Sequence, residues 1–291
     1  MSNPLPFDLM SDGFARCPCG QHQMQELYLS LGDYTIMRCL ECGLGWTHPP
    51  PAPIDYAAAD FHFCAAGGGI AGRITVDSLP SEWQRSLLIQ AALLQKYLPR
   101  QAHIHEVGCG QGLFLEILGQ SGFQVSGIDP SVSAAAIARS KGLDVETGFF
   151  GAKNVPRTPK CIVLSHVLEH LEKPFDALAT AAEVVHGGYL LFFQTNYRGL
   201  IPRIVGRKWT WIPEQHFWHF TPASLARWLS RYGFVPIETI YTPLVQHHWK
   251  TKLLNGIAGL VPPAYDGFIT LFGSRSADSQ TPISRESPDK R

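Results

Sequence analysis

Short apolar runs alternate with longer segments along the centre of this chain, and in the longer segments apolar residues recur every three or four positions. The apolar runs predict strands at 104–107, 123–128, 144–147, 161–165 and 189–195. The helical period predicts helices at 112–121, 131–141 and 174–185. This alternation predicts a parallel sheet with helices on both faces, and such sheets bind ligands at the carboxyl ends of their strands.

Further elements are predicted on both sides of this region. Residues 81–98 form a predicted amphipathic helix whose apolar stripe contains Leu87, Leu88, Ala91, Leu94 and Leu98. Residues 221–232 form another, because a threonine with a capping hydroxyl precedes a proline at the first helical position. A strand is expected from Gly233, a helix at 253–261 and an antiparallel last strand at 266–272. An apolar surface segment that touches a membrane or a partner is the alternative for this last region.

Glycines alternate with other residues directly after the first of the parallel strands, at Gly108, Gly110 and Gly112. Glycine allows the backbone to approach a ligand closely and to take φ values closed to other residues. Asp129 follows the next strand, and an acidic side chain there can accept hydrogen bonds from both hydroxyls of a ribose. A dinucleotide-binding motif needs a further glycine where Leu113 stands, and the Lys-Ser/Thr of a P-loop is missing. The pattern favours a nucleoside ligand without phosphate.

This block resembles the class I S-adenosylmethionine-dependent methyltransferases. Residues 165–171, Ser-His-Val-Leu-Glu-His-Leu, are similar to the family motif that follows the fourth strand, and Gly187-Gly188 is similar to the turn before the fifth. The resemblance covers residues 80–240. It implies an α/β fold with a doubly wound, Rossmann-like seven-stranded sheet, S-adenosyl-L-methionine as the cofactor and methyl transfer as the activity.

The same resemblance implies which residues hold the cofactor. Glu106 anchors the glycine turn, the glycines run along the amino-acid moiety and the ribose, and Asp129 holds the ribose hydroxyls. Phe149 or Phe150 packs on the adenine. The full implied set is Glu106, Gly108, Cys109, Gly110, Gly112, Asp129, Pro130, Phe149, Ser165, His166 and Val167. Family members often place an acidic residue near the adenine amine, and the stretch 147–152 offers none.

A base is needed if the acceptor is a hydroxyl or an activated carbon, and histidine is suited to that task near neutral pH. His166 stands at the tip of the fourth predicted strand, and His216 lies in an aromatic-rich segment at 196–220. These two are the catalytic candidates, followed by His170 and His219. A purely structural role is the alternative for each of them.

Four of the seven cysteines form two close pairs about twenty residues apart, Cys17 with Cys19 and Cys39 with Cys42. Such pairs predict a zinc ribbon, and four protein ligands make the ion structural, since no open position is left for chemistry. Only Pro18 separates the first pair, so Cys19 with His22 is the alternative to Cys17 with Cys19. Four reduced cysteines without metal are the remaining possibility. Relatives in the resembled family carry similar N-terminal ribbons.

These elements predict a small N-terminal zinc-ribbon-like module at 1–47 and a linker or flap at 48–80. A methyltransferase domain at 81–273 with an insertion at 196–220 follows, and then a disordered tail at 274–291. Within the module, strands are expected at 26–31 and 34–38.

Composition limits the function classes. Lys plus Arg and Asp plus Glu are both 24, so the formal net charge is zero, which argues against a broad nucleic-acid-binding face. No signal peptide and no apolar run of membrane-spanning length is found, so a cytoplasmic protein is expected.

Three functions fit the sequence. The favoured one is methyl transfer to oxygen or carbon of a small molecule such as a sugar, a polyketide or another secondary metabolite. An RNA methyltransferase with a zinc-ribbon substrate module and a non-catalytic relative that binds S-adenosylmethionine are the alternatives. The sequence determines neither the acceptor, nor the methylated atom, nor the oligomeric state, nor the role of residues 242–273.

Overall fold

The computed structural model describes most of the chain between Cys17 and Arg275. The described residues are 17, 19, 25–31, 33–52, 55–56, 73–155, 158–206, 209, 215–244 and 265–275. The predicted helix at 253–261, the predicted tail beyond Arg275 and the alternative zinc ligand His22 lie outside these residues.

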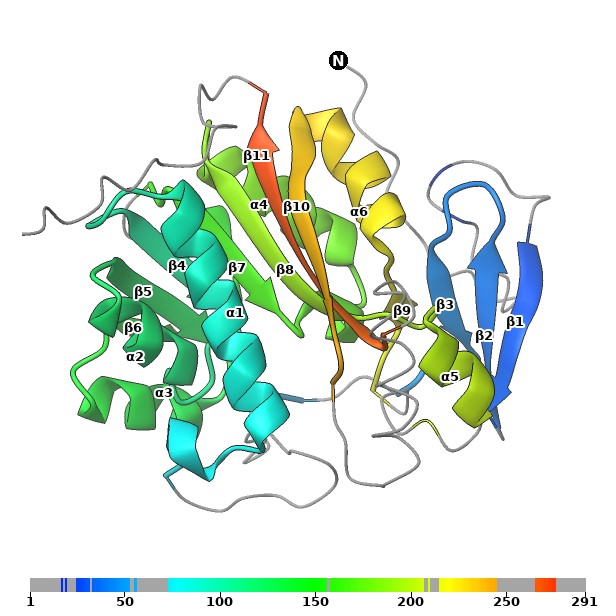
Figure 1. Ribbon diagram of the computed structural model, residues 1–291, viewed down its shortest axis with the longest axis horizontal. Coiled ribbons are helices and arrows are strands. Elements are labelled where there is room, and N and C mark those ends of the chain that lie inside the picture. The colour runs from blue at the N-terminus through cyan, green and yellow to red at the C-terminus, as the bar shows by residue number, and fades with distance from the viewer. Residues whose placement is uncertain are drawn as a thin grey trace, which may run out of the picture.

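The predicted sheet is present, with seven strands in the order β10-β11-β8-β7-β4-β5-β6 (Figure 1). In chain order they are β4 (His103–Val107), β5 (Gln124–Asp129), β6 (Val145–Thr147), β7 (Cys161–Ser165), β8 (Tyr189–Thr195), β10 (Phe234–Thr242) and β11 (Gly267–Ser274). Strands β6, β5, β4, β7 and β8 are parallel, whereas β11 is antiparallel to β8 and to β10. The doubly wound, Rossmann-like fold with an antiparallel strand near the C-terminus is thus confirmed.

Helices cover both faces of this sheet. The α-helices of this domain are α1 (Ser81–Tyr97), α2 (Leu113–Gln120), α3 (Val132–Ser140), α4 (Pro174–Val184) and α6 (Pro222–Leu229). The 3-10 turns are η2 (Val76–Ser78), η3 (Ala152–Asn154), η4 (Leu168–His170) and η6 (Ser230–Tyr232). Side chains of β8 alternate between two cores: Leu190 and Phe192 pack with α4 and α6, whereas Leu191 and Phe193 pack with α1 and α2. All seven residues of β8 are buried, as expected for the middle of such a sheet.

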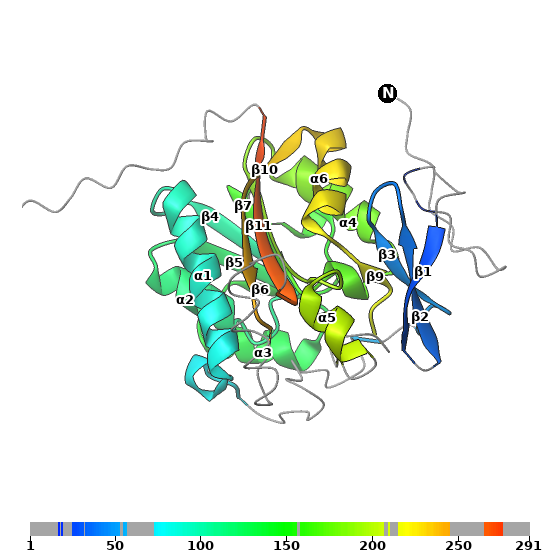
Figure 2. The ribbon, with the colours of Figure 1, turned by 45° about the vertical axis from the view of Figure 1, so that its right-hand side comes forward.

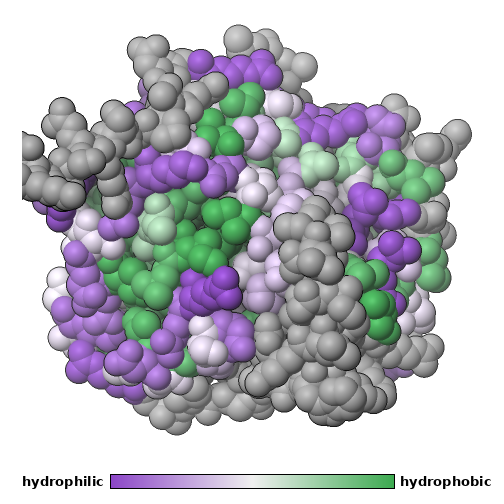
Figure 3. All heavy atoms as spheres, viewed as in Figure 1, coloured by the Kyte–Doolittle hydropathy of each residue, from purple (hydrophilic) through white to green (hydrophobic). Residues whose placement is uncertain are grey.

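Helix α1 begins at the predicted residue and ends one residue earlier than predicted, and one residue of the predicted apolar stripe is wrong. Leu88 is 57% exposed, whereas Leu94 is fully buried. At 100° per residue the two side chains are about 120° apart around the helix axis, so they cannot both face the sheet. Trp83 and Tyr97 complete the buried side instead. Apolar atoms gather on the surface over α1 in Figure 3.

A second, smaller sheet holds the N-terminal cysteines, and it is larger than predicted. Its order is β1-β2-β3-β9, with β1 (Gln25–Leu31), β2 (Tyr34–Cys39), β3 (Gly45–His48) and β9 (Trp218–His219), all antiparallel. The first two strands were predicted, whereas β3 and β9 were not. Strand β9 comes from the segment predicted as an insertion at 196–220, which also contains α5 (Leu200–Val205). Figure 2 shows β9 at the edge of the small sheet that faces the rest of the molecule.

Candidate active site

The glycine turn lies at the carboxyl end of β4, and all three of its glycines have positive φ values. A Cβ at Gly108 would lie 2.7 Å from Cγ2 of Val167, and one at Gly112 would lie 2.3 Å from Cδ1 of Leu143. These two positions are therefore closed by neighbouring side chains. At Gly110, by contrast, no atom of the described residues lies within 4 Å of the Cβ position. The backbone is thus accessible to a ligand at Gly110.

Asp129 ties this turn to the end of β5. Its Oδ2 accepts a hydrogen bond from the Gly110 amide at 2.7 Å, and its Oδ1 accepts one from the Ser131 amide at 2.9 Å. Each carboxylate oxygen has two lone pairs and can accept more than one hydrogen bond. The acidic side chain therefore orients the turn at the position where a ribose was predicted to bind.

Glu106 lies behind the turn and is buried. Burial, together with the neighbouring Asp129 carboxylate, raises the pKa of Glu106 well above its usual range. Its Oε2 atom has no hydrogen-bond partner among the described residues. A buried polar atom without a partner is costly, so a polar group of a ligand would complete this environment.

Two apolar side chains are exposed at the same edge of the sheet. Val132, just after β5, is 59% exposed, and Phe149, just after β6, is 68% exposed. Pro130 lies between Asp129 and the helix that follows. Cys109 packs in a core with α3 and offers a ligand only its backbone. The accessible backbone at Gly110, the Glu106 oxygen without a described partner and the exposed apolar side chains together fit an adenosyl ligand.

The carboxyl end of β7 carries the second group of predicted residues. His166 has a φ of 54°, a left-handed conformation that is uncommon for a residue other than glycine and is often found at functional sites. Its Nδ1 lies 3.1 Å from Oε1 of Glu169, whose side chain is 1% exposed. Burial alone raises the pKa of Glu169, but the hydrogen bond from His166 and the nearby histidines outweigh it, and the pKa falls to about 2. Since a carboxylate accepts, Nδ1 of His166 carries the proton.

His170 and His216 each have a donor atom within 4.8 Å of a Glu169 oxygen, and their ring centroids are 4.6 Å apart. Nδ1 of His170 lies 3.1 Å from the Gln215 carbonyl, which can only accept, so Nδ1 donates and Nε2 keeps a lone pair. Burial lowers the pKa of His170 and holds that of His216 well below the usual range. The two predicted catalytic histidines, His166 and His216, are thus brought together around one carboxylate.

Thr47 of β3 fixes this histidine cluster from the side of the small sheet. Its Oγ1 donates to the His216 carbonyl at 2.6 Å and lies 2.9 Å from Nε2 of His219. Because the hydroxyl proton is used on the carbonyl, Nε2 of His219 donates to Thr47. Thr47 was not predicted as a site residue, since nothing along the chain relates it to residues about 170 positions away.

Two aromatic side chains that were not predicted lie beside the cluster. The ring of Tyr56 is 6.0 Å from that of His170, and the ring of Trp83 is 5.4 Å from that of His166. Burial and the charge of Glu169 raise the pKa of Tyr56 to about 12. Tyr56 belongs to the predicted linker, where no periodic pattern distinguishes it, and Trp83 was part of a helix without an assigned role.

The linker also reaches the glycine turn. The Ile74 amide donates to Oε1 of Gln111 at 2.8 Å, and the Ile74 side chain is buried against Leu79 and Trp83. The described parts of the predicted flap therefore contact both the glycine turn and the histidine cluster.

The four predicted cysteines lie together at one end of the small sheet. The Sγ atoms of Cys17 and Cys42 are 3.4 Å apart, those of Cys19 and Cys39 are 3.6 Å apart, and all four lie within 4.8 Å of one another. Disulfide sulfur atoms would be about 2.05 Å apart. Thiolates on a tetrahedral zinc ion would be about 3.8 Å apart, given Zn–S bonds of about 2.3 Å. The arrangement fits a four-cysteine zinc site.

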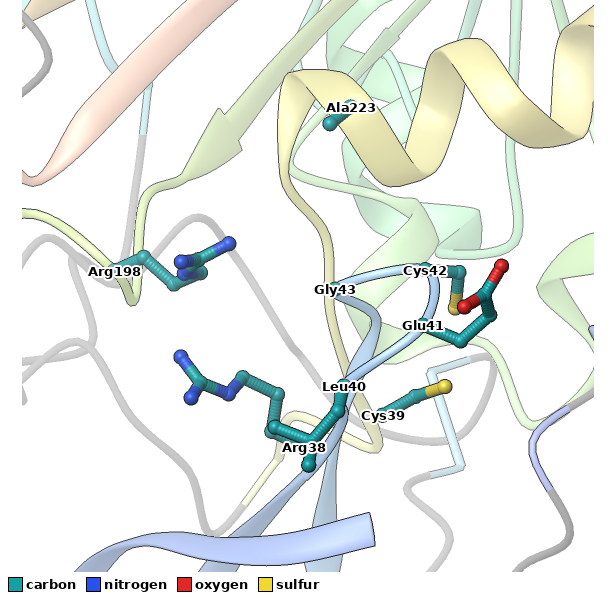
Figure 4. Close-up of a pocket in the computed structure, with 8 residues that line it drawn as sticks. All are labelled: Arg38, Cys39, Leu40, Glu41, Cys42, Gly43, Arg198 and Ala223. Carbon is teal, nitrogen blue, oxygen red and sulfur yellow. The ribbon is translucent and has the colours of Figure 1, made fainter. Parts of the chain in front are cut away.

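A recess of about 230 Å³ lies beside the second cysteine turn. Figure 4 shows the guanidinium groups of Arg38 and Arg198 on one side of this turn and the sulfur atoms of Cys39 and Cys42 on the other. Four thiolates around one zinc ion carry a net charge of −2, because the ion offsets only two of them. Arg38 and Arg198 line the recess beside this turn, so their positive charge would partly offset the negative charge of such a site.

None of the helices in the described ranges has the length and apolar character needed to cross a bilayer.

Comparison with known proteins gives the family. A family model described as a methyltransferase domain matches residues 81–239, more than half of the chain, and the chain belongs to this family. It is 26% identical over 181 residues to the ubiquinone biosynthesis O-methyltransferase of Saccharophagus degradans, covering 54% of this chain and 76% of that protein. The corresponding protein of Burkholderia orbicola is 32% identical over 114 residues, covering 34% and 49%.

Among solved structures, the chain is similar to magnesium protoporphyrin IX methyltransferase (ChlM) from Synechocystis PCC 6803 with bound SAH. The TM-score is 0.50 and the sequence identity 17%, over 66% of this chain and 84% of that one. At this identity the likeness concerns the fold. Together with the family match, it identifies the chain as an S-adenosylmethionine-dependent methyltransferase.

Proposed function

Since this chain is an S-adenosylmethionine-dependent methyltransferase, we propose that it methylates an oxygen or carbon atom of a small acceptor held against His166. The observation that carries this proposal is the His166–Glu169 pair at the carboxyl end of β7, with a distance of 3.1 Å and a buried carboxylate. The parallel strands place this pair at the same edge of the sheet as the glycine turn. Donor and acceptor would therefore meet between them.

The cofactor would supply an electrophilic methyl group on a sulfonium. The Gly110 backbone and Asp129 would hold its amino-acid and ribose parts, and Glu106 would complete the polar contacts behind the turn. Val132 and Phe149 would flank the adenine, since both are exposed apolar groups at this edge. Ser165 and Val167 would line the sulfonium end.

His166 would act as the general base. Its Nδ1 proton is held by Glu169, so Nε2 has the lone pair that takes the proton from an acceptor O–H or C–H group. The ionised Glu169 would then stabilise the imidazolium, and it would hold the ring in one tautomer throughout the reaction. His216 has a ring nitrogen within 4.8 Å of the same carboxylate and is the second candidate for contact with the acceptor.

A small acceptor fits this environment better than RNA does. Tyr56 and Trp83 flank the histidines and would pack on a ring or an aliphatic chain. The chain has no excess of basic residues with which to bind a phosphate backbone. The names of the curated relatives favour oxygen as the methylated atom. A hydroxylated sugar, polyketide or other secondary metabolite is therefore the proposed substrate class.

The test is the formation of S-adenosylhomocysteine from S-adenosylmethionine with a panel of hydroxylated small molecules and with a structured RNA. His166→Ala and Glu169→Gln should lower turnover on the accepted substrate by about 100-fold, the usual worth of general acid–base catalysis. The exposed His186 provides the control His186→Ala, which should keep full turnover. Turnover on RNA alone, or full turnover of His166→Ala, would contradict the proposal.

We further propose that Cys17, Cys19, Cys39 and Cys42 hold a structural zinc ion in a module at 1–47. The support is the clustering of the four sulfur atoms and the neighbouring arginines. Purified chain should contain one zinc per molecule, and Cys39→Ser should lose it, whereas Cys161→Ser, which changes a cysteine buried in β7, should keep it. Equal zinc in both variants would contradict this assignment.

A further inference from the structure

Three side chains near η4 bring metal-binding atoms together far from the cysteines in sequence. One donor atom each from Glu169, His170 and His216 lies within 4.8 Å of the others. Donors on one ion with bonds of about 2.1 Å are about 3.4 Å apart in a tetrahedral site. In an octahedral site with the same bond length, donors on opposite sides of the ion are about 4.2 Å apart. Modest side-chain rotations would therefore bring all three donor atoms into bonding distance.

Both histidines have a ring nitrogen free to bind an ion. The Nδ1–H group of His170 donates to the Gln215 carbonyl at 3.1 Å, which leaves the lone pair of the ring on Nε2. A backbone carbonyl in this position is the usual partner that orients a metal-binding imidazole. On His216, Nδ1 is buried and has no hydrogen-bond partner among the described residues.

The carboxylate has unused capacity as well. One oxygen of Glu169 is bonded to His166, whereas the other, Oε2, is buried without a partner within the described part of the chain. A buried carboxylate oxygen without a donor destabilises the fold. The buried Nδ1 of His216 likewise has no partner among the described residues, so it does not supply a hydrogen bond to Oε2. A single divalent cation would satisfy both atoms at once.

We propose that Glu169, His170 and His216 bind one divalent cation, in addition to the ion held by the cysteines. Two imidazoles and one carboxylate suit Mn²⁺, Fe²⁺, Co²⁺ or Zn²⁺, whereas four thiolates select zinc. Three protein ligands leave coordination positions open. The consequence for catalysis rests on the proposed function: the ion would bind the acceptor hydroxyl and lower its pKa, and His166 would receive the proton.

Mn²⁺ is the probe that separates the two sites, because this hard ion binds poorly to thiolates and well to carboxylate and imidazole. The zinc-loaded full-length chain would be titrated with Mn²⁺, and the free ion would be followed by its paramagnetic resonance signal. Wild type should bind one Mn²⁺ per chain. Glu169→Gln and His216→Gln should each weaken this binding at least about 10-fold, and the surface control His186→Gln should bind like wild type.

Affinity for S-adenosylhomocysteine, measured by calorimetry, shows whether each variant remains folded, and His170→Asn provides a third ligand variant if either of the others does not. The proposal is overturned if wild type binds no Mn²⁺ up to about 1 mM, or if folded ligand variants bind it as tightly as wild type. Mn²⁺ binding by a chain that methylates none of the small molecules would leave the metal site in place and contradict the proposed function. Loss of the ion without loss of turnover would separate the site from catalysis.

Discussion

The substitution Thr47→Val tests whether the small sheet positions the histidine cluster. Thr47 is 3% exposed, and its hydroxyl bonds both the His216 carbonyl at 2.6 Å and Nε2 of His219 at 2.9 Å. Valine keeps the shape of the side chain but has no hydroxyl, so one buried acceptor and one buried donor lose their partner. Each such group costs about 1 to 3 kcal/mol, so the free energy of unfolding should fall by about 2 to 4 kcal/mol after a small gain from the added methyl group.

The matched control is Thr35→Val on the neighbouring strand β2. Thr35 donates one hydrogen bond to the His48 carbonyl at 3.1 Å, and it is only partly buried. Water can replace that bond, so the loss should be about 1 kcal/mol or less. Urea unfolding of the zinc-loaded chain measures both values, and turnover should fall only for Thr47→Val because His216 is displaced. Equal stability of the two variants, with equal turnover, would refute the idea that β3 holds the cluster.

Three further predictions follow from the contacts at the sheet edge. Gly112→Ala should destabilise the chain in thermal unfolding, because its Cβ would lie 2.3 Å from Leu143. Gly110→Ala should chiefly weaken the binding of S-adenosylhomocysteine measured by calorimetry. A loss of binding for Gly112→Ala and a loss of stability for Gly110→Ala would contradict the geometry. Asp129→Ala should weaken the same binding at least about 10-fold, and unchanged affinity would remove the cofactor assignment. Burial raises the pKa of Asp266 to about 6, so the folded state keeps the proton of this carboxyl group up to a higher pH than the unfolded state does. The stability that this group contributes is therefore lost as the pH rises from about 4 to 6. Asp266→Asn should flatten this part of the plot of unfolding free energy against pH, and an unchanged slope would refute the assignment.

The elements of the large sheet could be predicted because their signals are local. A strand such as β7 is a short apolar run, and a helix such as α6 begins with a threonine that caps it and a proline at its first position. Leu88 shows the limit of this approach, since periodicity indicates an apolar stripe but not which edge of it meets the sheet. That choice depends on how the whole helix packs.

The candidate site could be predicted only where a motif carries it. His166 and His216 were identified separately, but the carboxylate that joins them and the contact of His216 with β3 depend on pairing between distant segments. Strand β9 has two residues and no alternating pattern, and its partner β3 is far away in the chain. Tyr56 lies in a stretch whose composition suggests only a linker. Such residues become visible only when the fold brings the segments together.

The pairing of β9 with β3 limits how this chain can be rearranged. A shortened chain that starts after His48 would lose the partner of Trp218 and His219 and leave two buried side chains on an open sheet edge. Exchange of the cysteine-bearing region between relatives would succeed only if residues 215–219 were exchanged with it. Strands β3 and β9 therefore have to be inherited as one unit, although about 170 residues separate them in the sequence.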